Sequence, residues 1–189
     1  LWTIAQAHHT TIANLKAINQ LTTNTIYSGQ TLRIPPRNQT KEITPIFERE
    51  PVKKNYNSTQ AVRTNVLQQA QQYIGAGYKF GATLNEAPYL FDCSSFTQLV
   101  FQQNNISIPR VSRDQASMGV AVTQLKAGDL LFFTNRELYS DGRVGHVGIY
   151  MGDGRMIHAS SSRGVHITNN VFQNPYWSAN YLFAKRIIE

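Results

Sequence analysis

The sequence predicts an α+β domain that is preceded by a small helical unit and a linker. Two observations lead to this fold class. Past the linker, helical periodicity comes first and extended apolar segments follow, and this segregation is typical of α+β proteins. The chain also has 189 residues, of which 41% are hydrophobic and 15% charged. That is enough to bury a core, and it excludes a disordered chain.

The N-terminal unit is expected to span residues 1–34. Apolar residues at helical spacing predict two short helices, and a strand is expected over residues 31–34 after a turn at Gly29. Two consecutive prolines end this unit. Residues 35–60 are rich in Pro, Asn, Thr and charge, which predicts an extended linker.

The main domain is expected to span residues 61–189. Its first half carries helical stripes of apolar residues, and its second half carries short apolar segments bounded by glycine-rich turns. Together they predict helices packed on an antiparallel sheet. The expected helices cover residues 62–74, 93–104 and 112–118, and the expected strands cover residues 128–133, 144–151, 155–159, 164–168 and 181–187.

The chain is basic, with 18 Lys and Arg residues against 11 Asp and Glu residues, a net charge of +7 and a pI near 9.7. Such a surface favours polyanions, among them nucleic acid, anionic lipid and anionic cell-wall polymers. The basic residues form no helix interleaved with aromatics, so no nucleic-acid partner is expected. No run of about eighteen apolar residues occurs, so no membrane span is expected, and no export signal is visible.

Cys93 is the only cysteine, so an internal disulfide is excluded. It follows a loop rich in Gly and Pro and begins a predicted helix, where unpaired N–H groups and the helix dipole stabilise a thiolate. We therefore expect a nucleophile with a lowered pKa, although the neighbouring Asp92 acts in the opposite direction. The alternative is a buried cysteine that serves as a small hydrophobic residue.

His146 and His158 lie on two predicted strands that are joined by Gly152-Asp153-Gly154. A two-residue loop would place the two imidazoles on opposite faces of the sheet, whereas a three-residue loop places them on one face. Gly148 would then lie between them without a side chain to block the gap. We expect the three-residue loop, because Gly154 suits its left-handed position.

This arrangement predicts a catalytic triad, in which Cys93 attacks, His146 is the general base and His158 orients the base. Two alternatives compete with it. Both histidines could be satisfied strand residues without a catalytic role. One cysteine and two histidines could also ligate zinc, but the sequence has no close ligand spacing to support a metal site. We therefore expect no metal and no organic cofactor.

Five blocks of the main domain, in order, resemble the NlpC/P60 family of papain-like bacterial cell-wall cysteine peptidases. They cover most of the domain: Tyr78 to Gly81, Phe91 to Phe96, Leu125 to Leu130, Gly145 to Tyr150 and Ile157 to Ser160. The resemblance implies a papain-like α+β fold in which the nucleophile begins a helix packed on an antiparallel sheet. Three positions depart from the family's common pattern, since Ala82 and Ser95 stand where Gly is frequent and Gly145 where Ser is frequent.

The resemblance also implies the roles of individual residues. It assigns the nucleophile to Cys93, the base to His146 and the third position to His158, and it places Tyr78 in the oxyanion hole with the Cys93 N–H. It further suggests that Asp92 and Ser94 bind the amine end of a stem peptide.

Members of this family typically cleave the bond between γ-D-glutamate and diaminopimelate or lysine in peptidoglycan. A D,L-endopeptidase is therefore expected. The alternatives are a wall-binding protein without activity, and an amidase or acyltransferase on the same fold.

Residues 1–34 resemble a LysM module, a βααβ unit that binds the N-acetylglucosamine of glycan. The module's usual first strand, with its Gly-Asp, is absent, so a truncated unit is expected. Together the two resemblances imply a secreted bacterial protein associated with the cell wall, whose partners are stem peptides and glycan. A monomer is expected.

Overall fold

The computed structural model describes residues 1–8, 12–23, 25–34 and 57–189. The chain divides into two compact units, Leu1–Lys53 and Lys54–Glu189. Most of the predicted linker, residues 35–56, lies outside the described residues. Among the described helices, none has the length and apolar character needed to cross a membrane.

The N-terminal unit contains the two predicted helices, α1 (Trp2–Ala7) and α2 (Ile12–Asn19). The predicted strand over residues 31–34 is not formed. The Asn19 amide instead donates to the carbonyl oxygen of Arg33 at 2.8 Å and accepts the Arg33 N–H at 2.6 Å. The described residues of this unit hold no extended segment paired with this one, and a side chain takes the place of a neighbouring strand.

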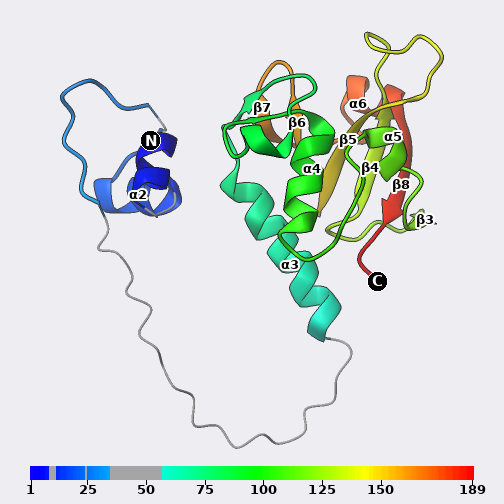
Figure 1. Ribbon diagram of the computed structural model, residues 1–189, viewed down its shortest axis with the longest axis horizontal. Helices are drawn as coiled ribbons and strands as arrows, with labels where there is room; N and C mark the ends of the chain where they lie inside the picture. Colours follow the sequence, from blue (N-terminus) through cyan, green and yellow to red (C-terminus); the bar gives the residue numbers. More distant parts are fainter. Residues whose placement is uncertain (9–11, 24, 35–56) are drawn as a thin grey trace, which may run out of the picture. The chain divides into compact units, whose positions relative to one another are not determined.

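The second unit is built on a six-stranded sheet in the order β3-β8-β4-β5-β6-β7, with every pair antiparallel. Figure 1 shows these strands side by side. The predicted strands are confirmed, and β3 is an additional short edge strand. The strands are β3 (Val120–Val122), β4 (Leu130–Thr134), β5 (Val144–Gly152), β6 (Arg155–Ser160), β7 (Gly164–Thr168) and β8 (Tyr181–Arg186).

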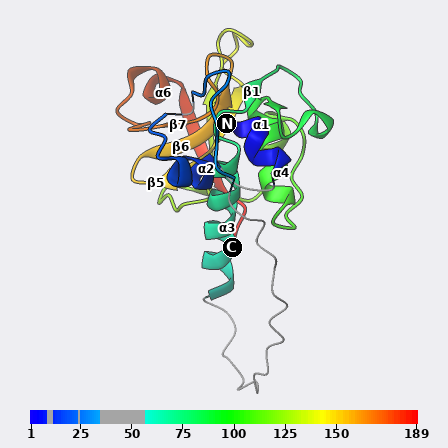
Figure 2. The same cartoon turned by 90° about the vertical axis from the view of Figure 1, so that its left-hand side faces the viewer.

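Two helices cover one face of this sheet. α3 (Asn57–Gln72) and α4 (Cys93–Gln102) lie side by side in Figures 1 and 2, and α4 packs on β5 and β6. Alternate residues of β5, among them Val147 and Ile149, join the helices in one buried cluster. α3 begins at Asn57, so residues 57–60 are helical although the sequence assigned them to the linker.

A small parallel pair of strands leads the chain into α4. β1 (Gly77–Tyr78) pairs with β2 (Leu90–Phe91), and a 3-10 helix, η1 (Leu84–Glu86), lies between them. Sequence periodicity did not predict these elements, because two or three residues are too few to show a period. These elements set the position of Cys93, since β2 ends two residues before it.

The remaining helices are short. α5 (Ser112–Gln115) confirms the helix expected over residues 112–118 but ends earlier, and α6 (Pro175–Asn180) was not predicted. The side chain of Asn174 caps α6 by accepting the N–H groups of Tyr176 and Trp177. α6 packs on β4 and brings Trp177 to the sheet face opposite α4.

A buried ion cluster joins distant parts of the domain around Asp129, which is fully buried. Arg63 of α3 reaches Asp129 Oδ1 with Nη1 at 3.2 Å. Arg186 of β8 donates to both carboxylate oxygens, with Nε at 3.0 Å and Nη2 at 2.8 Å. One carboxylate thus ties the first helix of the domain to its last strand.

Candidate active site

The start of α4 is fixed by a reciprocal cap. The Asp92 carboxylate accepts the Ser95 N–H at 2.8 Å, and the Ser95 hydroxyl oxygen accepts the Asp92 N–H at 2.9 Å. Such a cap sets where the helix begins. Ser95, one of the departures from the family pattern, therefore has a defined structural task. The cap holds Cys93 in the first turn of α4, where its backbone N–H has no acceptor within the helix.

The Cys93 thiol is not the preformed thiolate that the sequence predicted. Burial, followed by the charge of Asp92, raises the pKa of Cys93 to about 11. The N–H groups of Val147 and Ser94 and the charge of Arg110 act in the opposite direction, but they do not outweigh these effects. The expectation of a lowered pKa is wrong, because desolvation of the sulfur exceeds what the helix N-terminus supplies. Cys93 is a neutral thiol at pH 7.

The β5–β6 hairpin places both predicted histidines on one sheet face, but not through the expected loop. The turn has two residues, Asp153 at φ 53° and Gly154 at φ 70°, and pairs Gly152 with Arg155. Met151 is then an extra residue in β5, so that Ile149 pairs with Ile157. The three-residue loop is therefore wrong, while the shared face is confirmed, since the bulge restores the register that the loop would have given.

Gly148 leaves the space between the two histidines open, as predicted. A Cβ atom at this position would lie 2.4 Å from Met156 Sδ and 3.1 Å from His158 Cβ. Gly145 has a similar reason, because its Cβ would lie 2.6 Å from Asn135 Cβ. The side chain that the family frequently carries before the base therefore has no room here.

His146 and His158 form a buried pair. Nε2 of His146 lies 2.9 Å from Nδ1 of His158. Burial is the largest cause that lowers the pKa of His146 to about 4, and the charge of a protonated His166 adds to it. Burial also holds the pKa of His158 well below its ordinary value, with further contributions from His146, His166 and Arg163. Both imidazoles are neutral at pH 7.

Trp177 of α6 completes this buried environment. Its ring centroid lies 5.1 Å from that of His146 and 4.8 Å from that of His158. Sequence reasoning missed this residue, and its only local signal was the Asn-Pro pair that starts α6. The indole shields the pair from water and so contributes to the desolvation that keeps both rings uncharged.

Cys93 and His146, the predicted nucleophile and base, approach from opposite faces of the sheet and meet at β5. The N–H of Tyr150 points toward β4, so alternation directs that of Val147 toward β6. The registered β5–β6 pairs end at Ile149–Ile157, and beyond them the Val147 N–H lies near enough to the Cys93 sulfur to lower the pKa of the thiol. In the described part of the chain no hydrogen bond joins the thiol to the imidazole of His146. The sulfur instead lies near the backbone N–H of Val147, the residue that follows His146 in β5.

Tyr78 lies between two cavities. It lines one of about 480 Å³ together with Cys93, and one of about 600 Å³ together with His146. Burial, followed by the negative charges of an ionised Cys93 and of Asp92, raises the pKa of Tyr78 to about 12. The phenol therefore keeps its proton and remains a hydrogen-bond donor at the boundary between the two cavities.

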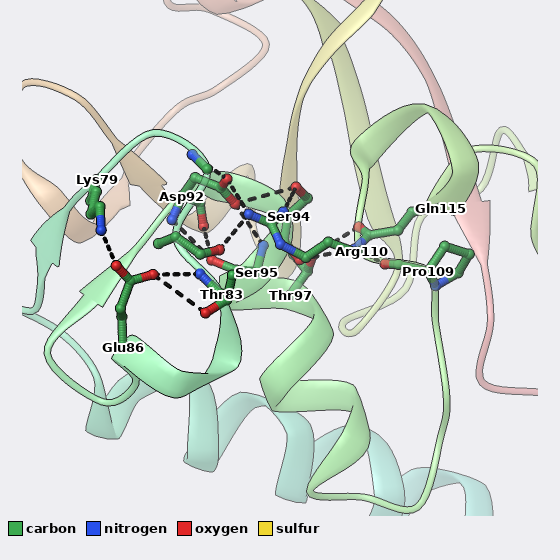
Figure 3. Close-up of polar contacts among 12 residues, drawn as sticks. Lys79, Thr83, Glu86, Asp92, Ser94, Ser95, Thr97, Pro109, Arg110 and Gln115 are labelled. Atoms are coloured by element: carbon green, nitrogen blue, oxygen red, sulfur yellow. Dashed lines mark hydrogen bonds and ion pairs between the residues drawn. The ribbon is translucent and has the colours of Figure 1, made fainter.

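Asp92 and Ser94 are both bonded to an arginine that the sequence analysis did not single out. Figure 3 shows Arg110 reaching them from the loop before α5. Its Nη2 lies 2.6 Å from Asp92 Oδ2, and its Nη1 donates to Ser94 Oγ at 2.9 Å. Arg110 also bonds the carbonyl of Ala82, and the left-handed residue of this loop is Gly81 (φ 74°), so Ala82 is unstrained. A buried carboxylate such as that of Asp92 is stable only beside a cation. This requirement was the signal by which a basic partner of Asp92 could have been predicted.

No group of three or more His, Cys, Asp or Glu side chains in the described ranges is arranged to hold a metal ion. The facing nitrogens of His146 and His158 are bonded to each other, so they are not both free to act as ligands.

Known proteins resemble both units of the chain. Residues 75–186 match the NlpC/P60 family and residues 1–35 match the LysM domain. Gamma-DL-glutamyl hydrolase of Bacillus subtilis (strain 168) is 39% identical over 125 residues, which cover 65% of this chain and 29% of the relative. Gamma-D-glutamyl-L-lysine dipeptidyl-peptidase of the same organism is 39% identical over 97 residues, which cover 50% of this chain and 31% of the relative.

Murein DD-endopeptidase MepS/Murein LD-carboxypeptidase of Escherichia coli (strain K12) is 35% identical over 130 residues, which cover 67% of this chain and 64% of the relative. The chain thus spans less than two thirds of the length of each of these relatives. The crystal structure of an NlpC/P60 family protein from Bacillus cereus ATCC 10987 matches with a TM-score of 0.60 at 33% identity, over 67% of this chain and 40% of that one. The match covers the domain that carries Cys93, His146 and His158, and the chain belongs to the NlpC/P60 family.

Proposed function

We propose that this chain is a cysteine peptidase of bacterial peptidoglycan, and that it cleaves the amide bond between γ-D-glutamate and the third stem residue, diaminopimelate or lysine. The observation that carries the proposal is the placement of Cys93 against the strand of His146, whose imidazole is bonded to His158. Membership of the NlpC/P60 family and two relatives named for γ-glutamyl bonds support this substrate.

The neutral resting state of the site defines the order of the steps. The thiol proton of Cys93 moves to His146 as the sulfur attacks the amide carbonyl carbon. The oxyanion is held by the Tyr78 hydroxyl and the Cys93 N–H, and a donor of this kind lowers the barrier by about 2.7–4 kcal/mol. Protonated His146 then gives its proton to the leaving amine, and the thioester is hydrolysed by a water that His146 deprotonates.

The two cavities bind different parts of the substrate. The leaving amine must lie on the side of His146, so the third stem residue binds in the cavity lined by that imidazole. The acyl side then binds in the cavity lined by Cys93, where Asp92 and Ser94 receive the amine end of the stem peptide. Because Arg110 already pairs with Asp92, the ammonium group must share that carboxylate with the arginine.

The protein is proposed to act outside the cell, on the wall, as a monomer. The LysM match supports binding to the glycan, and the net charge of +7 supports adhesion to anionic wall polymers. Adhesion through charge weakens as ionic strength rises.

Mass analysis of wall fragments tests the proposal. Purified peptidoglycan containing diaminopimelate, and a second sample containing lysine, are incubated with the wild-type chain and with Cys93→Ala as the blank. We expect fragments that newly end in γ-D-glutamate and a new free amine on the third stem residue, only with the wild type.

Other products would contradict the proposed bond in distinct ways. Cleavage between two D-residues or after the third residue would match the activities in the name of the E. coli relative. Separation of peptide from sugar would indicate an amidase. Absence of any cleavage on both substrates, with the chain still bound to the wall, would favour a binding protein.

The acid limb of the pH profile tests the neutral state of the base. His146 accepts a proton only when neutral, so kcat/KM on a soluble stem peptide should fall as pH decreases through about 4 and stay flat from pH 5 to 8. An acid limb near 6.5, the ordinary pKa of histidine, would contradict the buried neutral pair.

Circular dichroism at each pH provides the control for unfolding. An unfolded chain protonates His146 below pH 6.5 whereas the folded chain does so only below about 4. The contribution of His146 to the free energy of unfolding is therefore complete above pH 6.5. It decreases by about 3 kcal/mol as pH falls from 6.5 to about 4.

A further inference from the structure

The two catalytic histidines are the first members of a longer chain of hydrogen bonds. Nε2 of His158 lies 2.9 Å from the hydroxyl oxygen of Thr168. That oxygen lies 3.4 Å from Nε2 of His166, and Nδ1 of His166 lies 3.0 Å from the carbonyl oxygen of Gly164. The chain therefore runs from His146 through three further side chains and ends on the backbone.

When the His166 ring is neutral, the backbone end fixes the direction of every bond in this chain. A carbonyl oxygen only accepts, so Nδ1 of His166 carries the proton and its Nε2, in the neutral ring, accepts. The Thr168 hydroxyl therefore donates to His166, and its oxygen accepts from Nε2 of His158.

The direction continues to the base. With its proton on Nε2, His158 accepts at Nδ1, so Nε2 of His146 must donate. His146 is then left with an unprotonated Nδ1. This nitrogen is the one that is free to take a proton, because the other is engaged with His158.

We propose that Thr168 and His166 are positioning residues that hold His146 in the tautomer with an unprotonated Nδ1. This inference rests on the proposed function, in which Nδ1 receives the thiol proton of Cys93. A ring with the opposite tautomer presents an N–H to the thiol and cannot act as the base. Selection of the tautomer by a neighbouring acceptor is a known requirement of such triads.

The sheet makes this arrangement rigid. His158 pairs directly with His166 across β6 and β7, so their side chains share one face. Thr168 follows His166 by two residues and therefore lies on the same face. The ring centroids of His158 and His166 are 4.4 Å apart. The strand register, and not a loop, thus sets the hydroxyl at hydrogen-bonding distance from both rings.

Nitrogen NMR of the histidine rings tests the tautomers without substrate. In the wild-type chain labelled with ¹⁵N-histidine, at pH 7.5, we expect His146 and His158 protonated at Nε2 and His166 protonated at Nδ1. In Thr168→Val, which keeps the shape but removes the hydroxyl, His146 should show a mixture of both tautomers. Thr168→Ser should restore the wild-type pattern. A protonated Nδ1 on His146 of the wild type would overturn the inference directly.

Kinetics on a soluble stem peptide give the second readout. Thr168→Val should lower kcat by about tenfold with little change in KM, and Thr168→Ser should recover most of kcat. Thr64→Val is the matched control, since the hydroxyl of this exposed residue bonds within α3 and should leave both parameters unchanged.

The two proposals fail in different ways. If the wild type cleaves the stem peptide and Thr168→Val keeps both kcat and the ring-nitrogen shifts, the positioning role is wrong and the proposed function stands. If the wild type cleaves no stem peptide, the proposed function is wrong. NMR could then still show the expected tautomer of His146, but that tautomer would have no role in catalysis.

Discussion

Replacement of Cys93 by alanine is expected to lower kcat for peptidoglycan cleavage by on the order of 10⁴-fold or more. The reason is that Cys93, the only cysteine of the sequence, supplies the thiol for the proposed covalent intermediate. His146, with a pKa of about 4, is a weak base and does not activate water by itself to a comparable extent. The measurement is the rate of fragment release per mole of protein, compared with wild type at equal concentration.

The fold should survive this substitution. Cys93 is 8% exposed, and alanine removes only the sulfur atom, so the melting temperature should change by a few degrees at most. Cys93→Ser is the matched control, because it keeps a polar group of similar size at the position of the sulfur, near the Val147 N–H. Both variants should still bind the wall. Residual activity above about 1% of wild type in Cys93→Ala would show that the thiol is not the nucleophile.

Replacement of Asp129 by alanine is expected to cost about 3–5 kcal/mol of unfolding free energy, because it leaves buried cationic groups unpaired. Asp129 is fully buried, Arg63 is 4% exposed, and Arg186 donates to both oxygens of the same carboxylate. A loss of this size is a large fraction of the stability of an ordinary domain, roughly 5–15 kcal/mol. Urea unfolding and the melting temperature, which should fall by roughly 10–20 °C, provide the check.

The control for this variant is a carboxylate in an exposed ion pair. Asp153 lies 3.6 Å from Arg155 and its side chain is 91% exposed, so Asp153→Asn should change stability by less than about 0.5 kcal/mol. Asparagine also tolerates the left-handed turn at this position. Equal stability of Asp129→Ala and wild type would mean that the arginines find solvent or other acceptors, and that the cluster is not a structural anchor.

The long, periodic elements of the main domain could be predicted from the sequence, and the short ones could not. α4 and the hairpin strands β5 and β6 carry enough residues to show a clear pattern. β1, with two residues, is too short to show any period, yet it positions Tyr78. Residues 31–34 show the reverse case, a strand pattern that forms no strand. An extended segment needs a pairing partner, and the described residues of the N-terminal unit hold none.

The active site shows which physical quantities a sequence leaves out. The shared face of His146 and His158 followed from parity, although the extra residue was Met151 in the strand and not a residue of the loop. The pKa of Cys93 could not be predicted, because it depends on how deeply the folded chain buries the sulfur. Thr168 and His166 were within reach of the same parity argument, since both lie on one face of a strand that had been predicted.

The neutral, buried thiol has a consequence for how long the protein would stay active in the oxidising setting proposed for it. Oxidants and alkylating agents react with exposed thiolates, and Cys93 at pH 7 is neither ionised nor accessible to more than a small degree. The chain holds no second cysteine that could return a sulfenic acid to the thiol through a disulfide. Burial therefore acts as chemical protection for this thiol, whose oxidation no other cysteine of the sequence could reverse.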